Sequence, residues 1–212
     1  MHRRSITIAT ILTTLACLSA LAASAPIPDT VTYTLDASRS KFMAHTGRSG
    51  LLWFKGKSHH LAASEFSGQI ELTMPHIQPA SLRLIVKAAS LHETAPHFTE
   101  QEKQIINKEL HDIVLHPDQY PEIVFQSTNV TAKTAGRIGV EVKLIGDLTL
   151  HGVTRRIEIP ANVTLNGDEL RAKGEFSIDR DDFKVKATSA AHGLVRVSNK
   201  VKFEFDIVGR RQ

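Results

Sequence analysis

Residues 140–167 read VEVKLIGDLTLHGVTRRIEIPANVTLNG, and apolar and polar side chains alternate along most of this stretch. Strict alternation places one face of a strand against a core and the other in water, which is typical of antiparallel sheets. Two breaks separate the alternating runs. Asn166-Gly167 predicts a type I′ hairpin turn, and Gly152 predicts a turn that needs a positive φ. The stretch therefore predicts consecutive antiparallel strands.

The same alternation recurs on both sides of this stretch, at 31–35, 69–72, 82–84 and 201–207. Together the runs predict an all-β protein of roughly eight antiparallel strands, arranged as a closed barrel or a sandwich. A barrel of this size can hold one small ligand inside. Outer-membrane barrels alternate too, but they carry aromatic girdles. Because aromatic residues make up only 6% of the chain, with one Trp, we do not expect a membrane-spanning barrel.

One segment departs from the alternation. Residues 98–110 read FTEQEKQIINKEL, in which Thr99 and Glu102 have the spacing of a capping box. We therefore expect a short helical insertion of about two to three turns at this place. The prolines at 117 and 121 are expected to end it, since the residue before a proline disfavours the helical conformation.

The first 25 residues have the layout of a secretory signal peptide. Arg3 and Arg4 form a charged start, an uncharged apolar stretch follows, and Ala23-Ser24-Ala25 is a small-x-small cleavage site. The stretch is rich in Ala, Ser and Thr and ends at this site, which favours cleavage over a transmembrane anchor. Cleavage near Ala25 leaves one domain, residues 26–212, in the periplasm or outside the cell.

Cys17 is the single cysteine of the 212 residues and lies inside the predicted signal peptide. Lipoprotein processing at Cys17 is an alternative to cleavage after Ala25, although Thr14 stands where a lipobox carries a large apolar residue. One cysteine excludes a disulfide framework and cysteine-rich zinc sites.

The formal charge is +4, and neither a run of five like charges nor a nucleic-acid-binding motif occurs, so we expect no nucleic-acid partner.

Several stretches resemble the YceI-like family. Residues 118–128, DQYPEIVFQST, and 146–154, GDLTLHGVT, resemble its two central motifs, while 33–40 and 177–183 are similar to its first strand and a late Arg-x-x-Phe turn. The resemblance runs from about Tyr33 to Val208. It implies a lipocalin-like eight-stranded antiparallel barrel, an exported location, and an apolar tunnel that holds a polyisoprenoid or a related long-chain lipid.

A long apolar ligand in such a barrel would contact the apolar side chains that the strands point inward. Each buried CH₂ group contributes about 0.8 kcal/mol, so binding needs no polar chemistry. The candidate lining residues are Phe42, Trp53, Phe54, Phe66, Ile70, Leu84, Val86, Phe125, Leu148, Phe176 and Phe203. A charged headgroup would need donors at the mouth, and Arg48, Lys55 and Lys57 are the candidates.

We therefore expect a non-catalytic lipid-binding protein without a cofactor. The 11 histidines keep open a rival class, a His-based metal- or haem-linked redox or stress accessory protein. We expect no metal site, because the neighbours His59 and His60 point to opposite faces of a strand and no HExxH occurs. A lipid-directed hydrolase is a further alternative, but no GxSxG motif is present.

Exposed strand edges can pair between subunits, so the sequence is compatible with a homodimer.

Overall fold

The computed structural model of the protein describes residues 29–49, 56–74, 78, 80–135, 139–186, 189–190 and 195–212. The strands are β1 (Asp29–Leu35), β2 (Lys41–Ser49), β3 (His59–Ala63), β4 (Phe66–Met74), β5 (Ala80–Lys87), β6 (Leu91–Glu93), β7 (Glu122–Ala135), β8 (Gly139–Leu150), β9 (Val153–Asn166), β10 (Glu169–Asp179), β11 (Ser189–Ala190) and β12 (Val195–Arg211). The helical elements are the helix α1 (Glu100–Glu109), the π-helical turn η4 (Leu110–Leu115) and the 3₁₀ turns η1 (Ala37–Arg39), η3 (Ala88–Ser90) and η5 (Arg180–Phe183).

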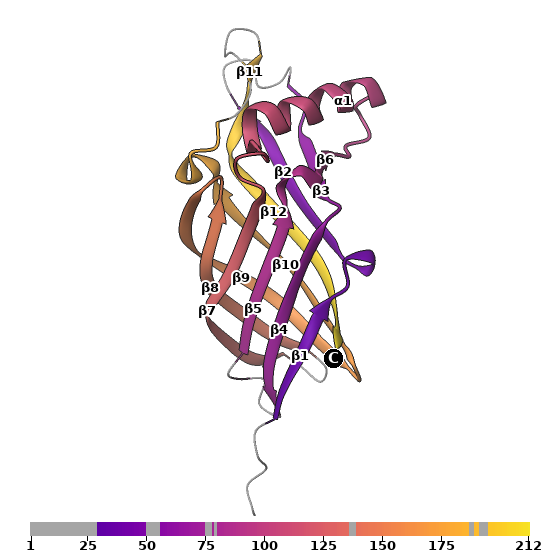
Figure 1. Ribbon diagram of the computed structural model, residues 1–212, viewed down its shortest axis with the longest axis vertical. Coiled ribbons are helices and arrows are strands. Elements are labelled where there is room, and N and C mark those ends of the chain that lie inside the picture. Colours follow the sequence, from indigo (N-terminus) through magenta and orange to yellow (C-terminus); the bar gives the residue numbers. More distant parts are fainter. Residues whose placement is uncertain are drawn as a thin grey trace, which may run out of the picture.

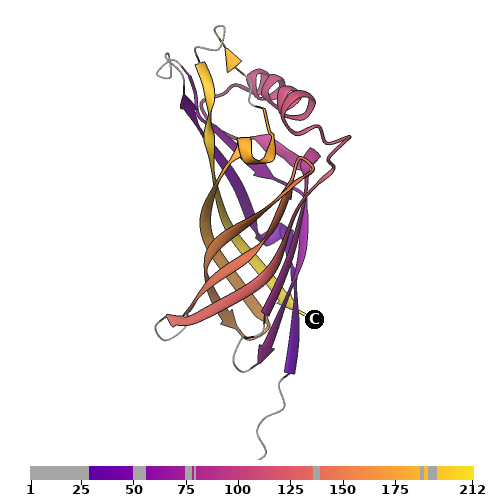
Figure 2. The same cartoon turned by 90° about the vertical axis from the view of Figure 1, so that its left-hand side faces the viewer.

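Eight strands close into an antiparallel barrel (Figures 1 and 2). Neighbouring strands pair in the order β1-β4-β5-β7-β8-β9-β10-β12, and β12 returns to β1. The alternation in the sequence explains the closure. On β8 the apolar Val142 and Leu148 are buried, while Glu141 and Lys143, on either side of Val142, are exposed. The predicted all-β, eight-stranded antiparallel barrel is confirmed.

Three further strands extend the sheet at one end of the barrel. The long strand β12 pairs with β2 as well as with β1, β2 pairs with β3, and β3 pairs with β6. We call β2, β3 and β6 the upper extension, since they lie in the upper part of Figure 1, beneath α1. None of the helices within the described ranges is long and apolar enough to cross a membrane.

The expected helical insertion is present and continues further than predicted. The Thr99 hydroxyl accepts a hydrogen bond from the Glu102 amide, and the Glu102 carboxylate accepts one from the Thr99 amide at 2.7 Å, so the capping box is complete. Beyond α1 the chain adds η4, which ends at His116 in the left-handed conformation, with φ at 48°. Leu110 and Leu115 of η4 are buried, and their burial explains why the helical segment continues.

Of the two predicted turns, the one at Gly152 is confirmed and the one at Asn166-Gly167 is displaced by one residue. His151 and Gly152 both have positive φ, 51° and 71°, as a two-residue type I′ turn requires. The type I′ turn predicted at Asn166-Gly167 is wrong. Asn166 still pairs with Glu169 in the ladder, so the turn residues are Gly167 and Asp168, and of these two only Gly167 has a positive φ, 59°.

The two central sequence motifs lie against each other. Phe125 of the first motif pairs with Leu148 of the second across the β7–β8 ladder. The Tyr120 ring packs on the His151 ring with centroids 4.3 Å apart, and a Cβ added to Gly152 would lie 2.7 Å from the Tyr120 ring. The motifs therefore form one structural unit, two paired strands and the turn that Tyr120 covers.

Candidate functional site

The inward side chains of the barrel surround two adjoining cavities. The inner chamber, about 110 Å³, lies between the strands β4, β5, β7, β8, β9, β10 and β12, and Ser81 is the only polar side chain in its described lining. The outer chamber, about 180 Å³, lies towards α1 and η4 and is also lined by the upper extension. A single water needs only about 10–15 Å³, so each chamber can accept a much larger group.

Five apolar side chains line both chambers, which makes the two cavities adjacent compartments of one interior space. We call them the junction belt: Phe42, Val86, Ile123, Leu148 and Phe176. The Phe203 ring lies between two of them, stacked on Phe176 with centroids 4.9 Å apart and 5.9 Å from the centroid of Phe42. The wall between the compartments is therefore built mainly of aromatic and branched apolar groups.

Most of the lining residues proposed from the sequence lie on these cavities. Those that line one or both chambers are Phe42, Ile70, Leu84, Val86, Phe125, Leu148, Phe176 and Phe203. Phe66 is buried in the surrounding core, opposite Val86 in the β4–β5 ladder, but lines neither chamber. Trp53 and Phe54 lie outside the described residues.

The outer chamber also contains residues that the sequence reasoning missed. Leu110, Val114 and Leu115 of η4 contribute to its lining, and no periodicity in the sequence shows that a helix covers this end of the barrel. Thr46 follows Phe42 and Ala44 on the inward face of β2, so the alternation could have placed it inside. Arg180 reaches the chamber from η5.

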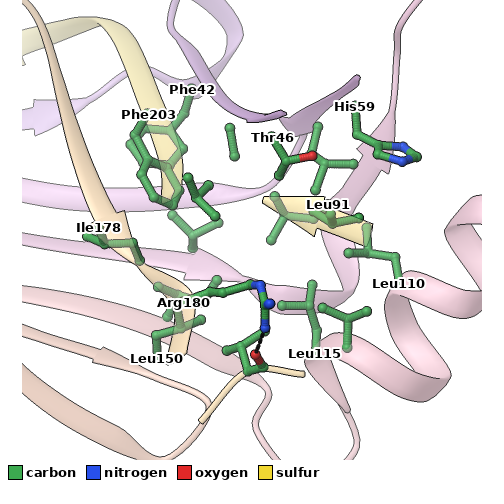
Figure 3. Close-up of a pocket in the computed structure, with 18 of the residues that line it drawn as sticks. Phe42, Thr46, His59, Leu91, Leu110, Leu115, Leu150, Ile178, Arg180 and Phe203 are labelled. Atoms are coloured by element: carbon green, nitrogen blue, oxygen red, sulfur yellow. Dashed lines mark hydrogen bonds between the residues drawn. The ribbon is translucent and has the colours of Figure 1, made fainter. Parts of the chain in front are cut away.

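The polar groups of the outer chamber come from four separate elements, and Figure 3 labels three of these groups, Thr46, His59 and Arg180. Thr46 is only 9% exposed, and its hydroxyl has no hydrogen-bond partner among the described residues. The Arg180 guanidinium donates to the Val185 carbonyl at 2.7 Å and to the Asp181 carboxylate at 2.9 Å. His59 of β3 and, at the exposed rim, Glu109 of α1 complete the polar part of the lining.

Behind His59 lies Glu93, a buried carboxylate of β6 that is 3% exposed. It accepts hydrogen bonds from His59 Nδ1 at 2.8 Å and from the backbone amides of His60, Thr94 and Ala95. Burial by itself raises the pKa of Glu93, but the hydrogen bonds from His59, Ala95 and His60 outweigh it, so the pKa is lowered on balance. Glu93 therefore stays ionised and fixes the orientation of the His59 ring.

Two of the three proposed headgroup donors, Arg48 and Lys57, do not line the cavities. Lys57 pairs with Glu102 at 2.9 Å, and its ammonium group lies 4.6 Å from the centre of the Phe98 ring, so it joins the start of β3 to the start of α1. Arg48 donates to the Gly56 carbonyl at 2.9 Å. Neither residue lines a chamber, and Lys55 lies outside the described residues.

Three of the described histidines bond to separate backbone groups. The rings of His92, His97 and His111 each contact a different carbonyl, those of Ser90, Ser58 and Leu91. His59 lines the outer chamber, whereas the His60 ring lies against His45 and His97. Within the described ranges, which omit His2, His76 and His192, no three His, Cys, Asp or Glu residues group in a way that could hold a metal ion.

A closed antiparallel barrel around apolar interior chambers defines the lipocalin-like class of binding folds. The model of the YceI-like domain matches residues 33–209 of this chain, and the chain belongs to the YceI-like family. The Tyr120–His151 packing and the Phe125–Leu148 pairing described above lie within the matched region.

Relatives known from their sequences include two UPF0312 proteins. One, from Vibrio campbellii, is 30% identical over 126 residues, which are 57% of this chain and 61% of that protein. Another, from Pseudomonas savastanoi pv. phaseolicola, is 33% identical over 133 residues, 60% of this chain and 64% of the relative. The matched region therefore spans a little less than two thirds of these relatives.

Solved structures share the fold at lower sequence identity. BcnA from Burkholderia cenocepacia has a TM-score of 0.63 at 20% identity, covering 82% of this chain and 98% of that one. A polyisoprenoid binding domain from Saccharophagus degradans, implicated in plant cell wall breakdown, has a TM-score of 0.59 at 16% identity, covering 85% and 98%. At these identities the likeness establishes the common barrel architecture.

Proposed function

We propose that the protein binds one long-chain apolar lipid, a polyisoprenoid or a similar chain, in the barrel interior and performs no catalysis. The observation that carries this proposal is that two apolar chambers adjoin inside the barrel and share the five side chains of the junction belt. An apolar cavity of this kind stays free of ordered water and accepts apolar groups. We propose that the hydrocarbon chain of the lipid contacts the candidate residues that line the chambers, and also Trp53 and Phe54.

The energy of such binding follows from buried apolar surface. About fifteen buried carbons contribute on the order of 10 kcal/mol at about 0.8 kcal/mol each, before the costs of association. A polar ligand would lose its hydrogen bonds to water in the inner chamber, where Ser81 is the one polar side chain among the described lining residues. The interior therefore selects a hydrocarbon chain over a polar molecule of the same length.

The similarity to the domain from Saccharophagus degradans supports this choice of ligand class, since that domain is described as polyisoprenoid binding. We further propose that residues 1–25 direct export and are removed near Ala25, so that the barrel domain, residues 26–212, acts in the periplasm or outside the cell. A homodimer stays a prediction from the sequence.

Native mass spectrometry of the protein purified from its own host tests the proposed function. We expect a complex of one protein molecule with one lipid molecule. The mass of the extracted lipid should fit a chain built from repeated isoprene or methylene units. The reason is that the two chambers adjoin at the junction belt and together form one apolar interior, which a single long hydrocarbon chain would occupy. A protein that carries stoichiometric metal and no lipid would contradict the proposal and favour the redox class.

A further inference from the structure

The Thr46 hydroxyl is an unusual group in this interior. It lies on the inward face of β2, in line with Phe42 and Ala44, and it lines the outer chamber. Thr46 is only 9% exposed, and its hydroxyl has no partner among the described residues. A buried hydroxyl without a partner costs free energy. A ligand atom that forms a hydrogen bond to it would remove this cost.

Two other groups beside the outer chamber can also bond to a ligand. His59 uses Nδ1 to contact the ionised Glu93, and when Nδ1 carries the proton of a neutral imidazole, Nε2 is an acceptor. Arg180 has five N–H donors, and its bonds to Asp181, Val185 and the Ser198 carbonyl use Nη1 and Nε. Three hydrogen-bonding groups therefore line one chamber (Figure 3). The Thr46 hydroxyl can donate and accept, His59 can accept, and Arg180 can donate.

We propose that the outer chamber is a headgroup site for a lipid that ends in a neutral oxygen, a hydroxyl or a carbonyl, bonded to Thr46 with support from His59 and Arg180. This inference rests on the proposed function and places the two ends of the ligand: the headgroup lies in the outer chamber, under α1 and η4, and the hydrocarbon chain passes the junction belt into the inner chamber.

The charges around the chamber argue against a phosphorylated lipid. The positive charge of Arg180 is already paired with Asp181 at 2.9 Å. The carboxylate of Glu109 lies at the rim, and Glu93 keeps its negative charge behind His59. A phosphate monoester would add a charge of about −1.5 to −2 to surroundings that offer no unpaired cation among the described lining residues. A neutral oxygen forms the same hydrogen bonds without that repulsion.

Three ligands with one carbon chain test this assignment: a linear prenol, its monophosphate, and the corresponding hydrocarbon, each titrated into the delipidated full-length protein. We expect the prenol to bind about 3- to 10-fold more tightly than the hydrocarbon, the gain of about one hydrogen bond. We expect the monophosphate to bind at least about tenfold more weakly than the prenol, because of the repulsion between like charges.

Variants assign the effect to the hydroxyl. Thr46→Val has nearly the same shape and should abolish the preference for the prenol while leaving the affinity for the hydrocarbon unchanged. Thr46→Ser keeps a hydroxyl and should restore the preference. Thr128→Val is the matched control, since it makes the same substitution at an exposed threonine of β7 that lines neither chamber and whose hydroxyl donates to the Ile145 carbonyl at 3.2 Å. It should leave the preference intact.

The outcomes separate the two proposals. If the hydrocarbon binds and the prenol binds no better, or the monophosphate binds best, the headgroup assignment is wrong while the proposed function stands. A preference for the prenol that survives in Thr46→Val also overturns the assignment. If none of the three ligands binds, the proposed function itself fails.

Discussion

Replacing Phe176 by lysine is expected to abolish lipid retention while the protein keeps its barrel. Phe176 belongs to the junction belt and lines both chambers. A lysine at this position places an ammonium group where the hydrocarbon chain would pass, and burying an unpaired charge against an apolar chain costs several kcal/mol. Lipid extraction and native mass spectrometry measure the retained ligand, and far-ultraviolet circular dichroism reports the β structure.

Asn162→Lys is the matched control for this variant. Asn162 is exposed on β9, opposite Glu141 of β8, so the same charge is added to the outer face of the barrel. The control should retain lipid at the level of the unchanged protein. For the case in which Phe176→Lys does not fold, Leu148→Phe narrows the junction belt without a charge and should weaken the binding of long chains. Full retention of lipid by a folded Phe176→Lys protein would show that the chain does not pass this belt.

Replacing Glu93 by alanine is expected to lower the free energy of unfolding by about 3 kcal/mol, because several buried N–H groups lose their acceptor. Glu93 accepts bonds from three backbone amides and from His59, and its own amide donates to the Asn107 side chain of α1 at 2.7 Å. It therefore joins β3, β6 and α1. Urea denaturation, extrapolated linearly to water, measures the loss.

Glu122→Ala is the control for Glu93, since Glu122 forms an exposed ion pair with Lys87 and such pairs contribute at most about 1 kcal/mol. A loss in Glu93→Ala no larger than in this control would contradict the role assigned to Glu93.

The same carboxylate predicts a pH dependence of stability. The folded-state pKa of Glu93 is lowered from its ordinary value of 4.5 by the hydrogen bonds from His59 and the backbone, although burial opposes the shift. A group with a lowered folded-state pKa stabilises the protein above its unfolded-state pKa and loses this contribution as the pH falls through the folded-state value. Below about pH 4.5 the unchanged protein should therefore lose stability more steeply than Glu93→Gln.

The sequence was sufficient for the barrel because one physical pattern repeats along it. The alternation around Val142 and Leu148 assigned the inward face of β8, and the same rule placed Phe42, Phe176 and Phe203 on inward faces. The capping box at Thr99 and Glu102 likewise predicted the start of α1, because it depends only on local contacts.

The rest of the candidate site depends on contacts between distant elements, which alternation does not encode. Glu93 has hydrogen-bond partners on β3, which is distant in the sequence and lies beside Glu93 because β3 pairs with β6. Its other partners are the backbone amides of the turn that follows it. The cover of η4 over the outer chamber is set by burial of Leu110 and Leu115, and Arg180 reaches the same chamber from η5. The turn predicted at Asn166-Gly167 was placed one residue too early, because Asn166 still pairs with Glu169 across the ladder. This cross-strand pairing cannot be read from the turn residues alone.

A crystal structure of the protein as purified from its own host tests whether the interior of the barrel holds a lipid. We expect continuous density for one lipid whose hydrocarbon chain runs from the inner chamber past Phe176 and Leu148 and whose headgroup lies within hydrogen-bond distance of the Thr46 hydroxyl. Interior chambers without such density, in a protein whose lipid lies on the outer surface, would contradict this expectation.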